Sequence, residues 1–315
     1  MFKALVLSAS LYAVQGKQFS KHHELESYSF DQYLQESGKK YSGDEYDLRL
    51  NIFNQNMEKI KAHNGEKRSW KMGVNKFTDM TPKEISMSYG GDKYSLHGNK
   101  KVTTALLKDN KVAELPTHVD WRDVQPSVVS PVKDQGHCGS CWAFAATATI
   151  ESHVAINTGL LNEVSQQELV SCMANDDSCG GTGGCMGATA ELAFDYLADK
   201  GLSELWSYGY LPNTYMNGIN NKCLRDDSSN VVASGTGYTL LERNNYDEIM
   251  NAVANVGPMA VNVDASVWHM YESGVFDGCA QEDVDINHVV GLVGYGTCEV
   301  HGDFWIIRNS WSPSW

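Results

Sequence analysis

No cysteine occurs before Cys138, and all eight cysteines of the 315-residue chain lie between that position and Cys298. The chain has no apolar run long enough to cross a bilayer, which excludes a membrane-spanning protein and favours a soluble one. It contains no N-x-[ST] acceptor for N-linked glycans, and no internal repeat or low-complexity tract, which excludes a repeat array. The one-sided distribution of cysteine indicates two regions of different character.

Basic residues are scarce in the second of these regions. From Lys17 to Ala113 there are 17 basic and 13 acidic residues, a net charge of +4, whereas Glu114 to Trp315 holds 7 basic and 26 acidic residues, a net charge of −19. An acidic surface repels phosphates, so nucleic acid is excluded as a partner. The length of the chain allows one or two domains with a sizeable core.

The N-terminus has the features of an export signal. Lys3 is followed by an apolar run from Ala4 to about Val14, which is too short to span a bilayer, and small residues lie near Gly16. We expect residues 1–16 to be a signal peptide, which places the chain in the secretory pathway and permits disulfides. The alternative is that these residues form the frayed first helix of the folded protein.

The run from Gln135 to Phe144 combines two cysteines with two glycines. The Ala-, Thr- and Ile-rich segment from Trp142 to about Ile156 predicts a buried helix, with Cys141 at its N-terminus. There the helix dipole and the outward-pointing N–H groups stabilise a thiolate, the form of cysteine that attacks carbonyl groups. The alternative for any cysteine of an exported protein is a disulfide, and we expect disulfides to account for most of the other seven.

Two motifs stand in the basic region. Spacings of four, four, three, four and four place the following residues on one stripe of a helix: Glu45, Arg49, Phe53, Asn56, Ile60 and Asn64. Periodicity alone also permits an ordinary amphipathic helix. The identities, however, match the E-x3-R-x3-F-x2-N-x3-I-x3-N pattern of cathepsin L-like propeptides, and the run Gly73-Val74-Asn75-Lys76-Phe77-Thr78-Asp79 matches their G-x-N-x-F-x-D.

The run Cys138-Gly139-Ser140-Cys141-Trp142 matches C-G-[SA]-C-[WY], the signature of papain and the cathepsins. With the two upstream motifs, the chain resembles a papain-family cysteine peptidase of the cathepsin L type, made as a zymogen. The resemblance implies a small helical propeptide domain over residues 17–113 and a peptidase domain over residues 114–315. It also implies that the propeptide tail, from Tyr89 to Lys111, runs through the cleft against the direction of a substrate.

A cysteine nucleophile needs a base, and spacing alone does not choose among the histidines of the peptidase region: His118, His137, His153, His269, His288 and His301. His288 lies 147 residues after Cys141 and opens a run to Gly296 that resembles the strand of the family that carries the base. The alternative for each histidine is a surface or core residue without a catalytic part.

By the same resemblance, Asn309 accepts a hydrogen bond from the imidazole and Trp311 shields that bond from water. Gln135 and the backbone N–H of Cys141 stabilise the oxyanion. Outside this context, Asn309 would be interpreted as a turn residue and Gln135 as a surface residue. The expected catalytic set is therefore Cys141, His288, Asn309 and Gln135.

Helices precede strands in the peptidase region. The pattern predicts helices over residues 142–156, 164–172 and 188–199, and strands over 231–241, 259–263, 289–295 and 304–308. Segregated helices and strands predict an α+β fold of a helical and a β-rich subdomain with the active-site cleft between them. The papain-like fold has this architecture.

The resemblance pairs Cys138 with Cys185 and Cys172 with Cys223, and it leaves Cys179, Cys279 and Cys298 without an assigned partner. The family continues past N-S-W-G with further strands, whereas Ser312 stands at the glycine here and the sequence stops at Trp315, so we expect a truncated C-terminus. The resemblance implies these substrate-binding residues: Gly187, Ala188, Thr189, Ala190, Asn262, Ile286, Asn287, Val289 and Trp311. The walls of the S2 pocket among them, namely Thr189, Ala190, Asn262, Ile286 and Val289, imply a mostly apolar P2 preference.

The resemblance implies a monomeric endopeptidase that acts on proteins and peptides, needs no cofactor or metal, and is inhibited by its own propeptide. It implies a lysosome, an acidic vacuole or the extracellular space as its location. The charge difference suggests that acid protonates carboxylates and so releases the propeptide. Two other interpretations remain: a catalytically silent homologue that binds or inhibits peptidases, and a structural disulfide protein. Thiol-dependent hydrolysis that Cys141→Ala abolishes would distinguish the peptidase from both of these alternatives.

Overall fold

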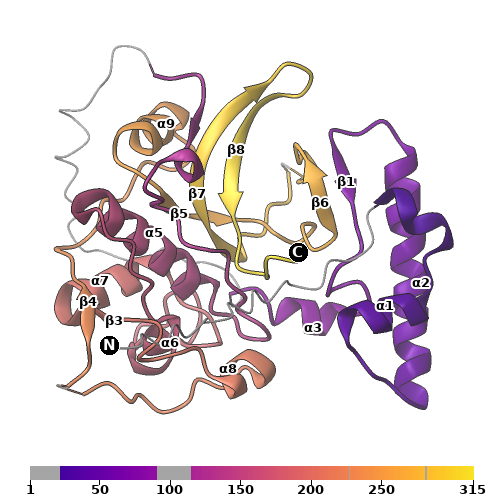
Figure 1. The fold of residues 1–315 in the computed structure, drawn as a ribbon, viewed down its shortest axis with the longest axis horizontal. Coiled ribbons are helices and arrows are strands. Elements are labelled where there is room, and N and C mark those ends of the chain that lie inside the picture. Colours follow the sequence, from indigo (N-terminus) through magenta and orange to yellow (C-terminus); the bar gives the residue numbers. More distant parts are fainter. Residues whose placement is uncertain (1–21, 91–114, 227, 281) are drawn as a thin grey trace, which may run out of the picture.

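The computed structural model describes residues 22–90, 115–226, 228–280 and 282–315. Within these ranges a small helical N-terminal part (residues 22–90) lies beside a larger C-terminal part (residues 115–315), as Figure 1 shows. The expected signal peptide lies outside the described residues, as does most of the expected propeptide tail. None of the helices in these ranges has the length and apolar character needed to span a membrane.

The N-terminal part contains η1 (His22–Ser27), α1 (Phe30–Ser37), α2 (Asp44–Gly65), β1 (Trp70–Met72) and α3 (Pro82–Ser86). Helix α2 confirms the predicted stripe: four of its six positions are buried, namely Arg49, Phe53, Asn56 and Ile60. Glu45 and Asn64 lie at the ends of the stripe. The side-chain amide of Asn64 donates to Met72 O and accepts from Met72 N, at 2.7 and 2.9 Å, and so ties α2 to β1.

Buried charge organises the interior of the N-terminal part. The Arg49 guanidinium donates to both carboxylate oxygens of Glu84 at 2.5 Å, and Glu84 completes a capping box with Thr81 at the start of α3. Asp79, fully buried, accepts hydrogen bonds from Tyr33 and Tyr41 at 2.8 Å and pairs with Lys39. These contacts fix the segment after β1 against α1 and α2.

The C-terminal part begins with helices around one central helix. They are α5 (Cys141–Thr158), α6 (Gln166–Cys172), α7 (Ala190–Lys200) and α8 (Pro212–Asn217). Helix α5 is buried along most of its length and packs against α6 and α7 on one side and the sheet on the other. The three predicted helices are confirmed, with later starts for α6 and α7, because Ser165 caps α6 and Thr189 stands at the N-cap of α7.

The sheet is built around β7 (His288–Cys298), which is buried through most of its length. Strands β5 (Met259–Val263), β2 (Val119–Asp120) and β8 (Gly302–Arg308) all pair with it antiparallel. Helix α9 (Tyr246–Asn255) packs on this sheet, and η2 (Trp121–Asp123) follows β2. The mixture of separate helices and an antiparallel sheet is the predicted α+β class, with the predicted helical and β-rich subdomains.

One predicted strand was too long. Residues 231–241 were expected to be extended throughout, but β4 covers only Val231–Ala233 and pairs with the short β3 (Leu202–Ser203). Gly235 and Gly237 follow, and Gly237 has a φ of +131°, a conformation that β-branched residues avoid. The backbone therefore leaves the ladder after Ala233, although Thr236, Tyr238 and Thr239 are residue types that favour strands.

The two parts dock through a strand pair and a shared apolar cluster. Strand β1 pairs antiparallel with β6 (Tyr271–Gly274), so a strand from each part contributes to a two-stranded sheet. Phe77 from the N-terminal part packs edge-on against Trp311, with ring centroids 5.2 Å apart. An ion pair between Lys76 and Asp134, at 2.6 Å, lies beside that contact. The N-terminal part therefore covers the surface that carries Trp311.

Candidate active site

Helix α5 presents Cys141 as its first residue. Ser140 is the N-cap, and its carbonyl accepts hydrogen bonds from the N–H groups of Ala143 and Phe144 at 2.9 and 3.1 Å. Cys141 is buried and is not in a disulfide. A thiol at this position lies at the positive end of the helix dipole, which favours the thiolate.

Strand β7 presents His288 as its first residue. The imidazole is fully buried, and the apolar cluster that contains both Cys141 and Val289 brings the start of β7 to the N-terminus of α5. Trp311 stacks on the ring with centroids 4.9 Å apart. Among the expected catalytic residues, Cys141 and His288 thus come from the two subdomains, which pack together around this cluster.

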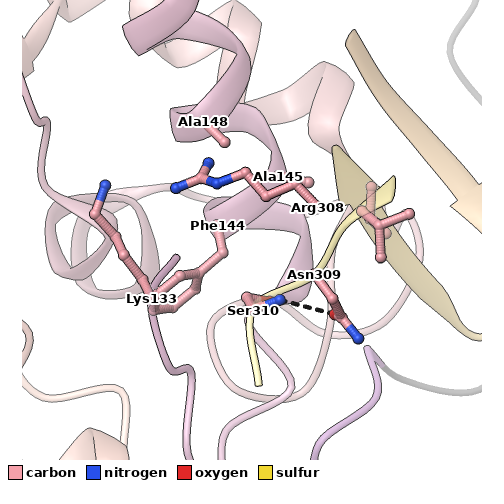
Figure 2. A pocket seen from close by; sticks show the side chains of 9 residues that line it. Lys133, Phe144, Ala145, Ala148, Arg308, Asn309 and Ser310 are labelled. Atoms are coloured by element: carbon pink, nitrogen blue, oxygen red, sulfur yellow. Dashed lines mark hydrogen bonds between the residues drawn. The ribbon is translucent and has the colours of Figure 1, made fainter. Parts of the chain in front are cut away.

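Asn309 determines which nitrogen of His288 carries the proton. Its Oδ1 accepts a hydrogen bond from the backbone N–H of Ser310 at 2.8 Å, a contact drawn in Figure 2, so the orientation of the amide is fixed. The same oxygen lies 2.8 Å from Nε2 of His288, which must therefore donate. In the neutral ring Nδ1 is then the basic nitrogen, and it makes no hydrogen bond within the described residues.

Burial controls the charge of His288. Removal from water disfavours the imidazolium and lowers the pKa of His288 to about 4, while the hydrogen bond to Asn309 acts in the opposite direction. In the covered site the imidazole is therefore neutral above about pH 4. A neutral imidazole can accept a proton from a thiol.

Gln135 is also fully buried, and both ends of its amide have partners. Its Nε2 donates to the carbonyl oxygens of Ser88 and Cys138 at 2.8 and 2.9 Å, and its Oε1 accepts from the Ser310 hydroxyl at 2.7 Å. The amide is thus oriented with its donor toward the N-terminus of α5. A donor held there can stabilise negative charge on an oxygen atom.

The segment from Ser88 to Gly90 lies across these residues. The Ser88 carbonyl accepts from Trp311 Nε1 at 3.3 Å in addition to Gln135, and the Gly90 N–H donates to Asn287 O at 3.1 Å. The Tyr89 ring meets His288 edge-on, with centroids 6.1 Å apart. The Tyr89 carbonyl leaves no room for a side chain at position 139, because a Cβ there would lie 2.5 Å from it. The N-terminal part therefore occupies the site directly.

The expected substrate-binding residues fall into two groups. Ala188, Ala190 and Val289 share the buried cluster with Cys141, and Gly187 and Thr189 are buried beside them. Asn287 is oriented by the backbone N–H of Ala265 and by the Ser266 hydroxyl, and Trp311 covers His288. In contrast, Asn262 opposite Val289 is exposed, and Ile286 is half-buried.

Two residues of the site carried no signal of their own in the sequence. Ser310 links Asn309 to Gln135, and its only sequence clue is its place between Asn309 and Trp311. Tyr210 donates to Gln135 O at 3.0 Å and lies 2.8 Å from the Ser140 hydroxyl, so it joins two ends of the 135–141 loop. An isolated tyrosine far away in the sequence offers no pattern from which this contact could be predicted.

Both disulfides expected from the resemblance are present, Cys138–Cys185 and Cys172–Cys223. The first ties the 135–141 loop to the segment before α7, and the Gly139 N–H donates to Cys185 O at 2.9 Å beside it. Cys179 is buried, Cys279 exposed and Cys298 partly exposed, and none of the three is in a disulfide. The bridge at Cys138 thus braces the loop that leads into Cys141.

One group of side chains has the spacing of metal ligands. Ligand atoms of His118, Asp120 and Asp123 lie within 4.8 Å of one another at the surface. Both carboxylate oxygens of Asp120, however, already accept hydrogen bonds from Arg122. The group lies apart from the catalytic residues and has no enclosed geometry of the kind that metal sites have.

Known proteins resemble both parts of the chain. Residues 115–315 match the papain family of cysteine proteases, and residues 30–85 match the cathepsin propeptide inhibitor domain. Cathepsin L of Sarcophaga peregrina is 34% identical and the match covers 88% of this chain and 81% of that protein. A cathepsin L-like protein of Caenorhabditis elegans is 33% identical over 100% of this chain and 91% of its own length.

Solved structures give the same result. The recombinant stem bromelain precursor superimposes with a TM-score of 0.75 at 32% identity, covering 91% of this chain and 87% of that structure. Digestive procathepsin L 3 of the Tenebrio molitor larval midgut superimposes with a TM-score of 0.74 at 30% identity, covering 94% and 91%. Both of these proteins are precursors, and the likeness includes the N-terminal part.

Proposed function

This chain belongs to the papain family of cysteine proteases and is a cathepsin L-like zymogen, and on this premise we propose that Cys141, His288, Asn309 and Gln135 carry its catalysis. The contact that best supports the assignment is the pair of hydrogen bonds that Asn309 Oδ1 accepts, from Ser310 N and from His288 Nε2. That pair leaves Nδ1 as the proton acceptor of a buried histidine near a helix-terminal cysteine. Acyl transfer requires this combination of nucleophile and oriented base.

The proposed reaction proceeds in two halves. His288 Nδ1 accepts the Cys141 proton, and the thiolate sulfur attacks the peptide carbonyl carbon. When the C–N bond breaks, His288 returns the proton to the departing amine and a thioester remains on Cys141. His288 then deprotonates a water molecule that attacks the thioester, which releases the acid and regenerates the thiol.

The proposed oxyanion donors are Gln135 Nε2 and the backbone N–H of Cys141. Gln135 is supported by the Ser310 hydroxyl at Oε1 and by burial, so its donor needs no reorganisation during the reaction. In the zymogen the Ser88 carbonyl occupies this donor. The propeptide would therefore compete with a substrate for the group that stabilises the transition state.

For substrate recognition we propose an apolar P2 pocket. Its supporting residues are Ala188, Ala190 and Val289, which are buried next to Cys141. Gly187, Thr189, Asn287 and Trp311 would line the adjoining cleft, whereas Asn262 and Ile286 would contribute only at its edge. Small side chains beside a nucleophile leave space for an aliphatic or aromatic group.

We further propose residues 1–16 as a signal peptide, 17–113 as the propeptide and 114–315 as the peptidase domain, acting as a monomer in a lysosome, an acidic vacuole or the extracellular space. Acid would release the propeptide. Glu84 is not the group that responds, because its hydrogen bonds to Arg49 and Thr81 lower its pKa to about 2. Release at milder acidity must involve other titrating groups.

Hydrolysis of a fluorogenic dipeptide with an apolar P2 residue tests this function. The chain and its Cys141→Ala variant would be compared at about pH 5 in the presence of a reducing agent, because the thiol must be reduced to react. We expect release of the fluorophore by the parent alone. Equal rates for the two chains, or no hydrolysis by either after the propeptide has been removed, would contradict the proposal and favour a silent binding homologue.

A further inference from the structure

Asp134 places a fixed carboxylate beside the proposed oxyanion donor. It directly precedes Gln135, its Oδ1 accepts from the Gly136 N–H at 3.0 Å, and its Oδ2 accepts from the Tyr215 hydroxyl at 3.0 Å. Its main chain is paired with that of Trp311. Both oxygens are therefore held in position by the peptidase domain itself, whether or not the propeptide is bound.

The zymogen fills this position with an ammonium group. Lys76 Nζ donates to Asp134 Oδ1 at 2.6 Å, and the two side chains retain only 20% and 19% of their exposure. The ammonium also lies 5.2 Å from the centre of the Phe77 ring. The propeptide thus brings a cation to a carboxylate at the edge of the catalytic site and covers the pair from water, where an ion pair is stronger than at an open surface.

Removal of the propeptide takes the cation away. Lys133, which directly precedes Asp134, is paired with Glu151 and Glu163 at 2.8 and 3.1 Å, so its ammonium does not compensate the Asp134 carboxylate. Among the residues that the structure describes, Lys76 alone forms an ion pair with Asp134. The processed enzyme would then expose an uncompensated carboxylate in a domain whose net charge is −19. Such a position attracts a basic side chain of a bound peptide.

The position of Asp134 also indicates which half of the substrate it meets. His288 must hand its proton to the leaving amine, so the leaving peptide departs on the side of this imidazole. Trp311 stacks on His288, and Asp134 is paired with Trp311. The proposed P2 pocket, supported by Ala188, Ala190 and Val289, binds the other half of the substrate. Asp134 therefore lies on the leaving-group side of the cleft.

We infer that Asp134 is a specificity residue that favours substrates with Lys or Arg among the first three residues after the scissile bond. Lys76 occupies the same position in the zymogen as a mimic of that side chain. The inference rests on the proposed function, because it concerns a substrate of the same site.

A matched set of internally quenched peptides tests the inference on the processed enzyme. The acyl half is constant, and Lys or Gln is placed at each of the three positions after the scissile bond. We expect kcat/KM at low salt to favour Lys over Gln by about 3- to 10-fold at one position or more, the range of a partly exposed ion pair of about 0.7–1.4 kcal/mol. Asp134→Asn should reduce the ratio to about one.

Asp303→Asn is the control, since it removes the same charge near the opposite end of β7, where Asp303 accepts a hydrogen bond from Thr297. Its Lys-to-Gln ratio should equal that of the parent. A second measurement needs no variant: about 1 M salt should weaken the preference of the parent, because ions screen a charge–charge contact. A ratio that survives high salt would overturn the inference.

The outcomes distinguish a failure of the inference about Asp134 from a failure of the proposed function. Cleavage that depends on Cys141 but shows equal rates for Lys and Gln would overturn the inference and leave the proposed function intact. A Lys preference that persists in Asp134→Asn would assign it to another residue and also overturn the inference. No Cys141-dependent cleavage of any peptide would contradict the proposed function, and the inference would fall with it.

Discussion

The carbonyl oxygen of Ser88 lies 2.8 Å from Nε2 of Gln135, so one hydrogen bond connects the propeptide to the proposed oxyanion donor. Gln135→Ala should therefore change both catalysis and inhibition. We expect kcat of the processed enzyme to fall by about 100- to 1,000-fold, the usual effect of losing one such donor. The same variant should also bind the isolated propeptide more weakly in a competition assay with an active-site-directed probe. Loss of only one of the two properties would contradict the shared use of Gln135.

Asn309→Ala should leave Cys141 and His288 in place but release the imidazole from its orientation. A hydrogen bond of this kind, to a group that becomes charged, contributes about 1.5–3 kcal/mol, which corresponds to about 10- to 100-fold in kcat/KM. Steady-state kinetics on the fluorogenic dipeptide would measure the loss. Asn309→Asp keeps an acceptor oxygen and should recover part of the rate. If Asn309 contributed only to folding, the two variants would lose kcat/KM to the same extent.

The buried His288 should make the zymogen less stable in acid. Its pKa in the folded zymogen is about 4, below the unfolded value of about 6.5, so the unfolded or opened state binds the extra proton. The stabilisation is complete above about pH 6.5 and is lost as the pH falls toward about 4. We expect the Tm of the Cys141→Ala zymogen to decline across that window. Adding His288→Gln should flatten the decline, and an unchanged slope would exclude His288 as the responding group.

The Glu84–Arg49 pair should respond to pH in a different window. The pKa of Glu84 is lowered to about 2, so its contribution is complete above the ordinary value of about 4.3 and is lost only as the pH falls through about 2. In the Cys141→Ala zymogen, Glu84→Gln should lower Tm by the same amount at every pH above about 5. The difference between parent and variant should shrink below about pH 4.

Phe77→Ala should weaken the attachment of the propeptide. Phe77 is 1% exposed and packs edge-on against Trp311, and truncation of a buried Phe costs about 3–5 kcal/mol. We expect a lower Tm of the Cys141→Ala zymogen and faster processing of the active chain. Phe304→Ala is the control and should not accelerate processing, because Phe304 lies on β8 and is not in the apolar cluster that contains Phe77 and Trp311.

Removal of the Cys172–Cys223 bridge should lower the free energy of unfolding by about 2–4 kcal/mol, the usual contribution of a disulfide. The double variant Cys172→Ser/Cys223→Ser would be compared with the parent by urea denaturation without reductant. Cys298→Ser changes a cysteine outside the disulfides and should alter stability by much less. Similar losses of stability in both variants would mean that the replacement of cysteine by serine, rather than the loss of the bridge, lowers the free energy of unfolding.

The sequence predicted most clearly those features that local pattern determines. The stripe of α2, the short strand-favouring runs at β5 and β7 and the Ala-, Thr- and Ile-rich run of α5 are local signals, and Cys141 at the start of α5 follows from the last of them. The strand expected beyond Ala233 was wrong because two glycines outweighed the strand-favouring threonine and tyrosine residues around them. Strand propensity alone does not keep a segment in a sheet.

Contacts between distant residues could not be predicted in this way. Tyr210 reaches Gln135 across 75 positions, and Lys76 reaches Asp134 across 58, so neither pair leaves a periodic trace. The histidine was chosen from six candidates only by resemblance to a known strand. The orientation of its ring depends on a backbone N–H at Ser310, which every residue except proline would supply equally well.

Strand β1 pairs with β6 inside a single chain, and this has a consequence for dilution. While the chain is intact, the propeptide remains at a high effective concentration near the site, so inhibition does not depend on how much protein is present. Once the chain is cut between the two parts, the same strand pair becomes an association between two molecules. The fraction of bound propeptide then falls as the solution is diluted, and dissociation of the propeptide contributes to activation together with cleavage.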